Sequence, residues 1–178
     1  WRVVSFVLLI PISYMQSMSA FIAQNMGAKK PERAKRTLFY GMGTSVVTGL
    51  IVFYFVCFHG DVLASIFTSD QTVIAAAAQY LKGFSVDCIQ VGILFCFMGF
   101  YNGCSRTKFV FFQAFWDSWV MRVPAAYIYS HMAGATLFHL SLATPTATTS
   151  TIIVCIIYYN IVKKNIFNYP KTAPKKAA

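Results

Sequence analysis

The chain has 178 residues, of which 57% are hydrophobic and only 11% are charged, and its formal net charge is +10. About a quarter of the residues in a soluble domain are charged, so a chain this poor in charge cannot cover a core with polar surface, and its apolar surface must face lipid. A positive net charge is also typical of nucleic-acid binding. Here, however, twelve of the fifteen Lys and Arg residues fall in three short clusters between or after apolar runs. The composition therefore predicts a membrane protein without a nucleic-acid partner.

Five apolar segments are long enough to cross a bilayer, which takes about 20 mostly apolar residues. They predict an all-α, polytopic membrane helix bundle with five transmembrane helices at about residues 3–26, 38–58, 83–101, 109–129 and 142–162. Pro11 predicts a kink in the first span, and Gly27 predicts its end, with the glycine in the left-handed conformation of a helix cap. Thr68 and Gln71 have the spacing of a capping box. This spacing predicts a helix that begins outside the membrane near Asp70 and runs on into the third span.

The three basic clusters orient the predicted bundle. They lie at residues 29–36, 106–108 and 163–176, and all three fall on one side of the membrane if every span is real. Because basic residues accumulate in cytoplasmic loops, this pattern predicts the first residue outside and the C-terminus in the cytoplasm. Residues 163–178 are then a basic, polar cytoplasmic tail.

The order of short motifs along the chain also carries a family resemblance. The motifs are AFIAQNMGA at 20–28, PERA at 31–34, YL at 80–81 with Asp87, GFYNGCSRTK at 99–108, RVP at 122–124 and LATP at 142–145. In order and spacing they resemble the C-terminal part of a multidrug and toxic compound extrusion (MATE) transporter. The resemblance implies that residues 1–162 form part of a C-terminal lobe, as helices eight to twelve of twelve, and that the N-terminal lobe is missing. A start at Trp1 rather than Met fits a piece of a longer protein; a complete small membrane protein is the alternative.

This resemblance implies a function as well as a fold. It implies efflux of small organic, often cationic, compounds across the plasma membrane, driven by inward flow of Na⁺ or H⁺, without a cofactor and without enzymatic catalysis. A related flippase for lipid-linked saccharides is one alternative, although the spans offer only Arg122 for the cationic cavity that it needs. A non-transporting membrane assembly protein is another. The sequence holds no nucleophile elbow, phosphate loop or metalloprotease motif, and its five cysteines favour small apolar packing over a metal site.

Asp87 is the leading candidate for ion coupling. An ionised acid at the centre of a membrane helix costs about 2.5–3.5 kcal/mol on insertion scales, so such residues usually have a function. Gly83 and Gln90 share its helix face: the glycine leaves room for a cation or a neighbouring helix, and Gln90 adds a carbonyl oxygen. The segment also resembles the family helix that carries an ion-coupling acid. The alternative is a structural acid that is hydrogen-bonded within the bundle, near the outer end of its span.

The fourth predicted span carries a second acid. Asp117 shares a helix face with Gln113 and Pro124, whereas Arg122 lies five residues on, about 140° around an α-helix. Asp117 and Arg122 are therefore predicted to be poor partners within one helix. Asp117 and Gln113 are candidates for a substrate cavity, although the neighbouring tryptophans favour an interfacial charge at headgroup depth. Arg122 and Pro124 match the family and are predicted to act in helix packing.

Further candidates for the substrate cavity lie in the first span. Met15 and Met18 flank Gln16, and methionine suits variable apolar ligands, although simple helix packing is the alternative. The hydroxyl-rich segment 144–151 in the last span predicts hydrogen bonds within or between helices, and a polar cavity wall is the alternative.

Overall fold

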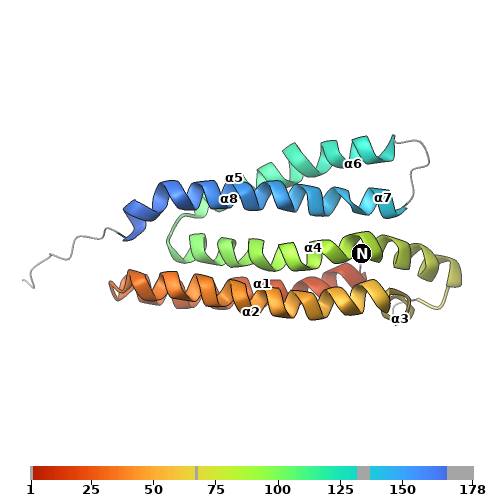
Figure 1. The fold of residues 1–178 in the computed structure, drawn as a ribbon, viewed down its shortest axis with the longest axis horizontal. Helices are drawn as coiled ribbons and strands as arrows, with labels where there is room; N and C mark the ends of the chain where they lie inside the picture. Colours follow the sequence, from red (N-terminus) through yellow and green to blue (C-terminus); the bar gives the residue numbers. More distant parts are fainter. Residues whose placement is uncertain (1, 67, 132–136, 168–178) are drawn as a thin grey trace, which may run out of the picture.

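The computed structural model describes residues 2–66, 68–131 and 137–167, and the regular elements in these ranges are all helical. In chain order they are α1 (Arg2–Gly27), α2 (Pro31–Phe58), α3 (Gly60–Ser65), α4 (Gln71–Gly103), α5 (Thr107–Phe115), the π-helical segment η1 (Trp116–Arg122), α6 (Val123–Ser130), α7 (Leu137–Ser141) and α8 (Ala143–Phe167). The long helices run roughly along one axis, and α4 lies between the α1–α2 pair and α8 (Figure 1).

Among the described residues, four helical stretches are long and apolar enough to cross a membrane. They are Val4–Gly27, Pro31–Phe58, Gln71–Gly103 and Leu137–Lys163. The predicted span at 109–129 is also helical, but η1 divides it into three shorter elements. The predicted all-α membrane bundle is thus confirmed, and the segment predicted as the fourth span is an α-helix, a π-helix and a second α-helix in succession. Of the predicted tail at 163–178, the part up to Phe167 continues α8, and the remainder lies outside the described residues.

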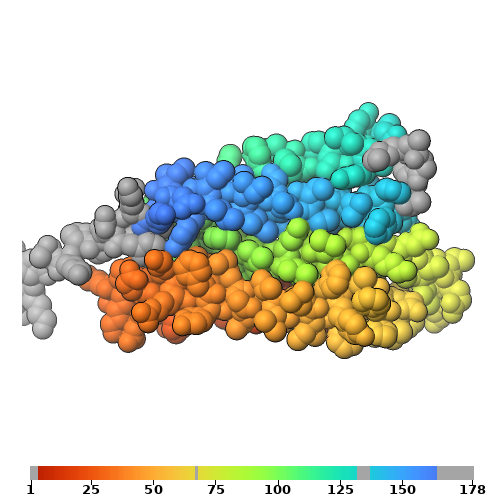
Figure 2. Space-filling model, viewed as in Figure 1, coloured from red at the N-terminus to blue at the C-terminus, as the bar shows by residue number. Residues whose placement is uncertain are grey.

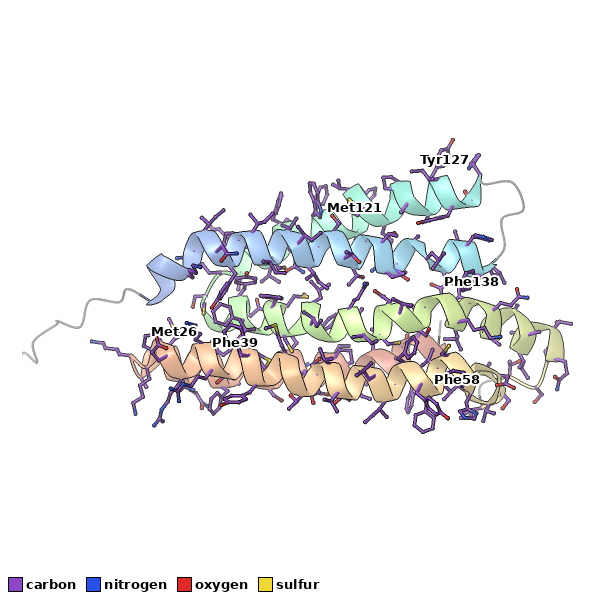
Figure 3. The ribbon with its side chains drawn as sticks, viewed as in Figure 1. Met26, Phe39, Phe58, Met121, Tyr127 and Phe138 are labelled. Carbon is purple, nitrogen blue, oxygen red and sulfur yellow. The ribbon has the colours of Figure 1, made fainter. Side chains whose placement is uncertain are left out.

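The central helix α4 contributes more buried residues to the core than any other described helix. Its most apolar window is 67% buried, whereas the corresponding windows of α1 and α2 are 11% and 17% buried. The outer faces of the peripheral helices carry large apolar side chains, among them Phe58 on α2 and Tyr127 on α6, which lie on opposite outer edges of the bundle (Figure 3). The space-filling view shows α2, α4 and α8 side by side along one such face (Figure 2). Exposed apolar surface of this extent is suited to contact with lipid or with further helices.

Small residues let α4 approach α1 and α2 closely. A Cβ atom at Gly99 would lie 2.7 Å from the carbonyl oxygen of Met15 and 3.2 Å from its Cα, so only glycine fits against the α1 backbone there. A Cβ atom at Gly92 would overlap the hydroxyl of Ser45 on α2. Such contacts are typical of membrane bundles, in which association depends on close packing and not on exclusion of water.

Two helices end in the same turn on one side of the bundle. After α1, Lys29 has a positive φ of 56°, and after α4 Ser105 has a φ of 59°. In each turn the residue after the left-handed one donates its N–H to the carbonyl five positions back, from Lys30 to Asn25 and from Arg106 to Tyr101. This is the hydrogen-bond pattern of a Schellman motif. The prediction that Gly27 itself adopts the left-handed conformation was therefore wrong, because Gly27 is the last helical residue and Lys29 makes the turn.

The start of α4 also differs from the capping box predicted at Thr68 and Gln71. The N-cap is Asp70, whose carboxylate accepts hydrogen bonds from the backbone N–H of Thr72 at 2.9 Å and from its hydroxyl at 2.7 Å. These two bonds favour the ionised form and lower the pKa of Asp70 below its ordinary value. The predicted helix start near Asp70 and its continuation into the third span are confirmed.

Candidate functional site

A large cavity of about 780 Å³ lies between α4, the α5–η1–α6 stretch and α7–α8, and Val4 and Leu8 of α1 also line it. Most of its wall is apolar, which is the usual character of small-molecule sites, and its volume falls within the range of about 300–1,000 Å³ that such sites occupy. Polar side chains interrupt the apolar wall at a few positions: Tyr80, Asp87, Gln113, Asp117, Ser118, Arg122, Thr144 and Thr148.

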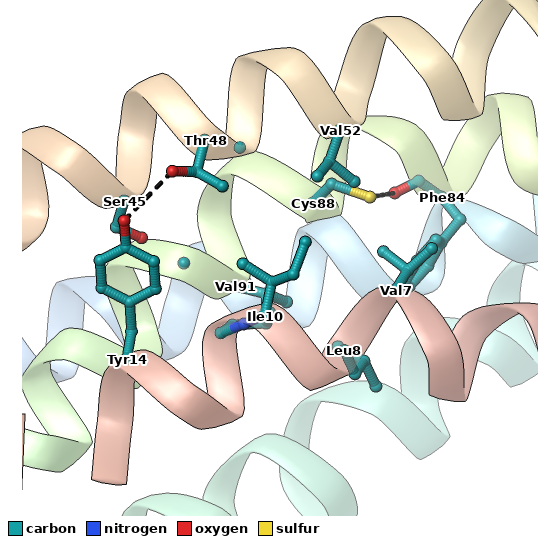
Figure 4. A pocket seen from close by; sticks show the side chains of 13 residues that line it. Val7, Leu8, Ile10, Tyr14, Ser45, Thr48, Val52, Phe84, Cys88 and Val91 are labelled. Atoms are coloured by element: carbon teal, nitrogen blue, oxygen red, sulfur yellow. Dashed lines mark hydrogen bonds between the residues drawn. The ribbon is translucent and has the colours of Figure 1, made fainter. Parts of the chain in front are cut away.

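A much smaller cavity of about 20 Å³ separates α1, α2 and α4 (Figure 4). Its lining is almost wholly apolar, and the Tyr14 hydroxyl shares a hydrogen bond of 3.2 Å with Thr48 at one end. This volume is close to the minimum that holds one water molecule. It is a packing defect on the tightly packed side of α4, and it is too small for an organic ligand.

Asp87 lies in the middle of the 33-residue α4. Its side chain is only 2% exposed, and its Oδ1 atom has no hydrogen-bond partner among the described residues. In depth it lies between Ile89, which contacts Gly49 of α2, and Leu81, which contacts Gly60 of α3. A buried oxygen without a partner costs about 1–3 kcal/mol, and more when the group is charged. Asp87 therefore presents an oxygen that a proton or a cation can satisfy.

The residues predicted to share the face of Asp87 take separate roles. A Cβ atom at Gly83 would overlap the hydroxyl of Ser141, so Gly83 accommodates the neighbouring α7 rather than a cation. The Gln90 amide donates from Nε2 to the Thr149 hydroxyl at 3.0 Å, while its buried Oε1 has no partner within the part of the chain that is described. Gln90 thus joins α4 to α8 beside Asp87 and leaves a second oxygen unsatisfied.

The relation between Asp117 and Arg122 was predicted wrongly. The structure pairs them, with Arg122 Nη2 3.1 Å from Asp117 Oδ2. The reason is η1: in a π-helix the hydrogen bonds run from residue i to i+5, so residues five apart return to the same face. Asp117 also accepts a hydrogen bond from the Thr151 hydroxyl at 3.0 Å. Its side chain is 13% exposed and lies on the cavity wall, whereas the sequence favoured an interfacial charge.

Gln113 marks the end of the cavity nearer the Schellman turns. Its side chain is buried, and its Oε1 accepts a hydrogen bond from the Cys155 thiol at 3.3 Å. Beyond it the Tyr101 hydroxyl donates to the Cys155 carbonyl at 2.7 Å, and Phe109 stacks on Tyr158 with ring centroids 3.7 Å apart. This buried layer closes the space between α4, α5 and α8.

The first-span candidates lie elsewhere. Met15, Gln16 and Met18 are not among the residues that line the large cavity. Met18 is a core residue whose thioether lies against Gly41 of α2, and the carbonyl of Met15 lies against Gly99. These contacts are the packing alternative that the sequence left open. Pro11 lies inside an uninterrupted α1.

Pro124 occupies the first turn of α6, directly after η1. Sequence reasoning missed Tyr80 as a cavity residue, whereas Thr148 lies in the segment for which a polar cavity wall was one alternative. Tyr80 lies seven residues before Asp87 and so on the same helix face, and Thr148 belongs to the hydroxyl-rich segment of the last span.

Comparison with known proteins was made with both the sequence and the fold. A model of the MatE family matches residues 1–128. The chain is 29% identical over 105 residues to the "FAD transporter" of Shewanella oneidensis, covering 59% of this chain and 23% of that protein. It is also 29% identical over 135 residues to the "Probable multidrug resistance protein NorM" of Mannheimia succiniciproducens, covering 71% of this chain and 27% of that protein. The chain thus spans about a quarter of the length of these curated relatives.

The fold gives the same answer. The structure superposes on a MATE family multidrug resistance transporter solved in an inward-facing conformation, with a TM-score of 0.85 over 96% of this chain and 39% of that one, at 15% sequence identity. At that identity the likeness concerns the fold alone. Together with the family match over most of the sequence, it shows that the helices have the arrangement of part of a MATE-type membrane bundle. The chain belongs to the MatE family, the multidrug and toxic compound extrusion transporters that its sequence resembles.

Proposed function

We propose that this chain forms the ion-coupling part of a transporter that exports organic cations in exchange for Na⁺ or H⁺. One observation carries the proposal: the Asp87 carboxylate is buried in the middle of the core helix, beside a drug-sized cavity, with one oxygen unsatisfied among the described residues. Charge in such a place persists only if a cation or a proton neutralises it.

Asp87 couples the ion to the substrate by competition for one negative charge. A Na⁺ ion takes oxygen ligands, and the free oxygens of Asp87 and Gln90 supply two of them; a proton neutralises the carboxylate directly. In either case the neutralised site holds an organic cation less tightly. Ion entry from outside therefore promotes substrate release there, and ion release to the cytoplasm restores the site. The coupling requires that both ligands bind the two transport conformations with different affinities.

The cavity suits amphipathic cations. Its wall is mainly apolar, Tyr80 offers an aromatic face, and Asp87 and Asp117 supply negative charge. An aromatic face attracts a cation with about 0.5–2 kcal/mol, depending on how dry the site is. In the whole transporter the N-terminal lobe completes the access path, the bilayer surrounds the bundle, and the basic clusters face the cytoplasm of a plasma-membrane protein. Export then follows from rocking of the two lobes about this site.

The test is Asp87→Asn in the full-length transporter, reconstituted in liposomes with an imposed Na⁺ or pH gradient. We expect loss of gradient-driven efflux of an organic cation, because asparagine keeps the shape of the side chain but cannot be neutralised by an ion. Asp61→Asn is the matched control, since Asp61 is exposed on α3 and remote from the cavity lining. Efflux that keeps its full dependence on the gradient in Asp87→Asn would contradict the assignment.

A second substrate class is favoured by one feature, Arg122 on the cavity wall. A guanidinium can pair with an anionic substrate, and one relative is named as a transporter of FAD. Competition of unlabelled FAD against an organic cation in the same liposomes distinguishes the two classes. A lipid-linked saccharide flippase and a non-transporting assembly protein are separated by the same experiment, because neither moves the cation.

A further inference from the structure

The ion pair between Asp117 and Arg122 depends on the π-helical geometry of η1. In an α-helix these side chains would lie about 140° apart, but the wider turn brings Arg122 Nη2 to 3.1 Å from Asp117 Oδ2. π-Helical turns are rare and occur frequently at functional sites. The pair is therefore a product of an uncommon backbone register and not of ordinary surface charge.

Asp117 is held in place without help from Arg122. The Thr151 hydroxyl lies 3.0 Å from the Asp117 Oδ1 atom and 3.0 Å from the Ala147 carbonyl of α8, and these two acceptors share its one proton. The neighbouring Trp116 indole donates to the Ser150 hydroxyl at 3.3 Å, which fixes η1 to the same helix. The carboxylate is thus preorganised for a positive partner.

Arg122 is held far less firmly than its partner. Its side chain is 43% exposed against 13% for Asp117, and a single nitrogen, Nη2, makes the ion pair. Its buried Nε atom has no hydrogen-bond partner among the residues that the structure describes. Arginine binds carboxylates most strongly through two parallel hydrogen bonds, and this pair lacks that arrangement. The Asp117 carboxylate is therefore fixed, whereas another cation can replace the Arg122 guanidinium.

We propose that Arg122 is a built-in competitor for the substrate, occupying at Asp117 the place of a substrate's cationic group. Both residues line the cavity that also contains the buried carboxylate of Asp87. An entering organic cation displaces the guanidinium from Asp117, and the guanidinium returns when the cation leaves. The inference rests on the proposed function in one respect, the cationic nature of the substrate. It adds a specificity rule: ligands without a positive group cannot exchange with Arg122.

The experiment measures equilibrium binding of tetraphenylphosphonium to the purified full-length transporter without an ion gradient. We expect Arg122→Gln to bind this cation about threefold to fivefold more tightly than wild type, because a partly exposed ion pair is worth up to about 1 kcal/mol. Arg122→Lys keeps the competing charge and should stay within twofold of wild type. Asp117→Asn combined with Arg122→Gln should lose the gain, since the vacated acceptor is then absent.

Unchanged or weaker binding in folded Arg122→Gln would overturn the proposal, as would a gain that survives Asp117→Asn. Arg122→Met serves as a second neutral variant. If neither neutral variant folds, as judged by thermal unfolding and size exclusion, the proposal also fails, because a side chain that leaves its partner in every cycle cannot be essential to the fold. The proposed function fails separately: wild-type and Arg122→Gln proteins that both bind no tetraphenylphosphonium contradict the cationic substrate class itself.

Discussion

The two sides of α4 differ in how they meet their neighbours. Toward α1 and α2 the helix presents glycines, and the backbones approach so closely that a single added methyl group meets a carbonyl oxygen. Toward α8 and η1 it presents Asp87 and large apolar side chains around a cavity. One helix thus combines a rigid contact with an open, chargeable wall. The close contact of α4 with α1 and α2 thus fixes the position of Asp87 on the wall of the cavity.

The sharpest test of the tight side is Gly99→Ala. The new methyl group would lie 2.7 Å from the Met15 carbonyl oxygen, and the α1 backbone cannot move aside without breaking other contacts. We expect a loss of about 1–3 kcal/mol in folding free energy, the usual cost of overpacking, measured by thermal unfolding in detergent. Gly43→Ala is the matched control, since a methyl group there meets nothing within 4 Å. Equal stability of the Gly99→Ala and Gly43→Ala variants would contradict the close packing of α4 against α1.

Tyr101→Phe tests the residues that close the large cavity at its end near Gln113. Removal of the hydroxyl deletes the 2.7 Å hydrogen bond to the Cys155 carbonyl, between two fully buried residues. We expect a loss of about 1 kcal/mol, typical of one such bond, in the same unfolding measurement. Tyr14→Phe on the tight side removes a longer, partly buried bond to Thr48 and should cost less. A larger loss of stability in Tyr14→Phe than in Tyr101→Phe would contradict a structural role for the residues around Tyr101.

The outer start of α4 gives a smaller effect that depends on pH. Hydrogen bonds from Thr72 lower the pKa of Asp70 below its ordinary value of 3.8. Its contribution to stability is therefore complete above that value and is lost as the pH falls through the lower folded-state pKa. We expect Asp70→Ala to be less stable than wild type at pH 7, with the difference shrinking below pH 3.8. A constant difference across the acid range would show that the charge of Asp70 plays no part.

The smallest change in stability is expected from a larger side chain on the wall of the large cavity. Ala114 lines the large cavity, so Ala114→Leu extends into free space. We expect a stability within about 0.5 kcal/mol of wild type, together with tetraphenylphosphonium binding about tenfold weaker, which corresponds to about 1.4 kcal/mol. A large loss of stability would mean that this wall is packed as tightly as the other side.

Much of the fold follows from apolar run length and glycine position, because both act locally. Four long helices coincide with predicted spans, and the helix start near Asp70 was predicted from its turn residues. The helix caps were predicted less well, since the choice between Gly27 and Lys29 as the left-handed residue depends on the path to the next helix. The predicted separation of Asp117 from Arg122 failed where the backbone is π-helical.

The site shows the same limit. Asp87 was found because an acid in an apolar run is conspicuous in sequence, whereas its vacant oxygen and its cavity depend on tertiary packing. The pairing of Asp117 with Arg122 was not predicted, because the periodicity of a sequence does not indicate a π-helical turn. One local signal was available: Pro124 has no N–H, so the Val120 carbonyl cannot make its α-helical bond there, which favours a change of register just upstream.

The length of α4 has a consequence for how ligands reach the site. The 33 residues of α4 extend about 50 Å, whereas the hydrocarbon layer is about 30 Å thick. A helix of that length fits within the layer only at a tilt of about 53°, which is beyond the range of about 0–40° seen for membrane helices. Val73, Ala76 and Ala77 belong to the first turns of α4 and already line the large cavity. Because the predicted third span begins near residue 83, we expect these first turns to stand outside the hydrocarbon layer, so that a solute meets the cavity wall from the aqueous phase.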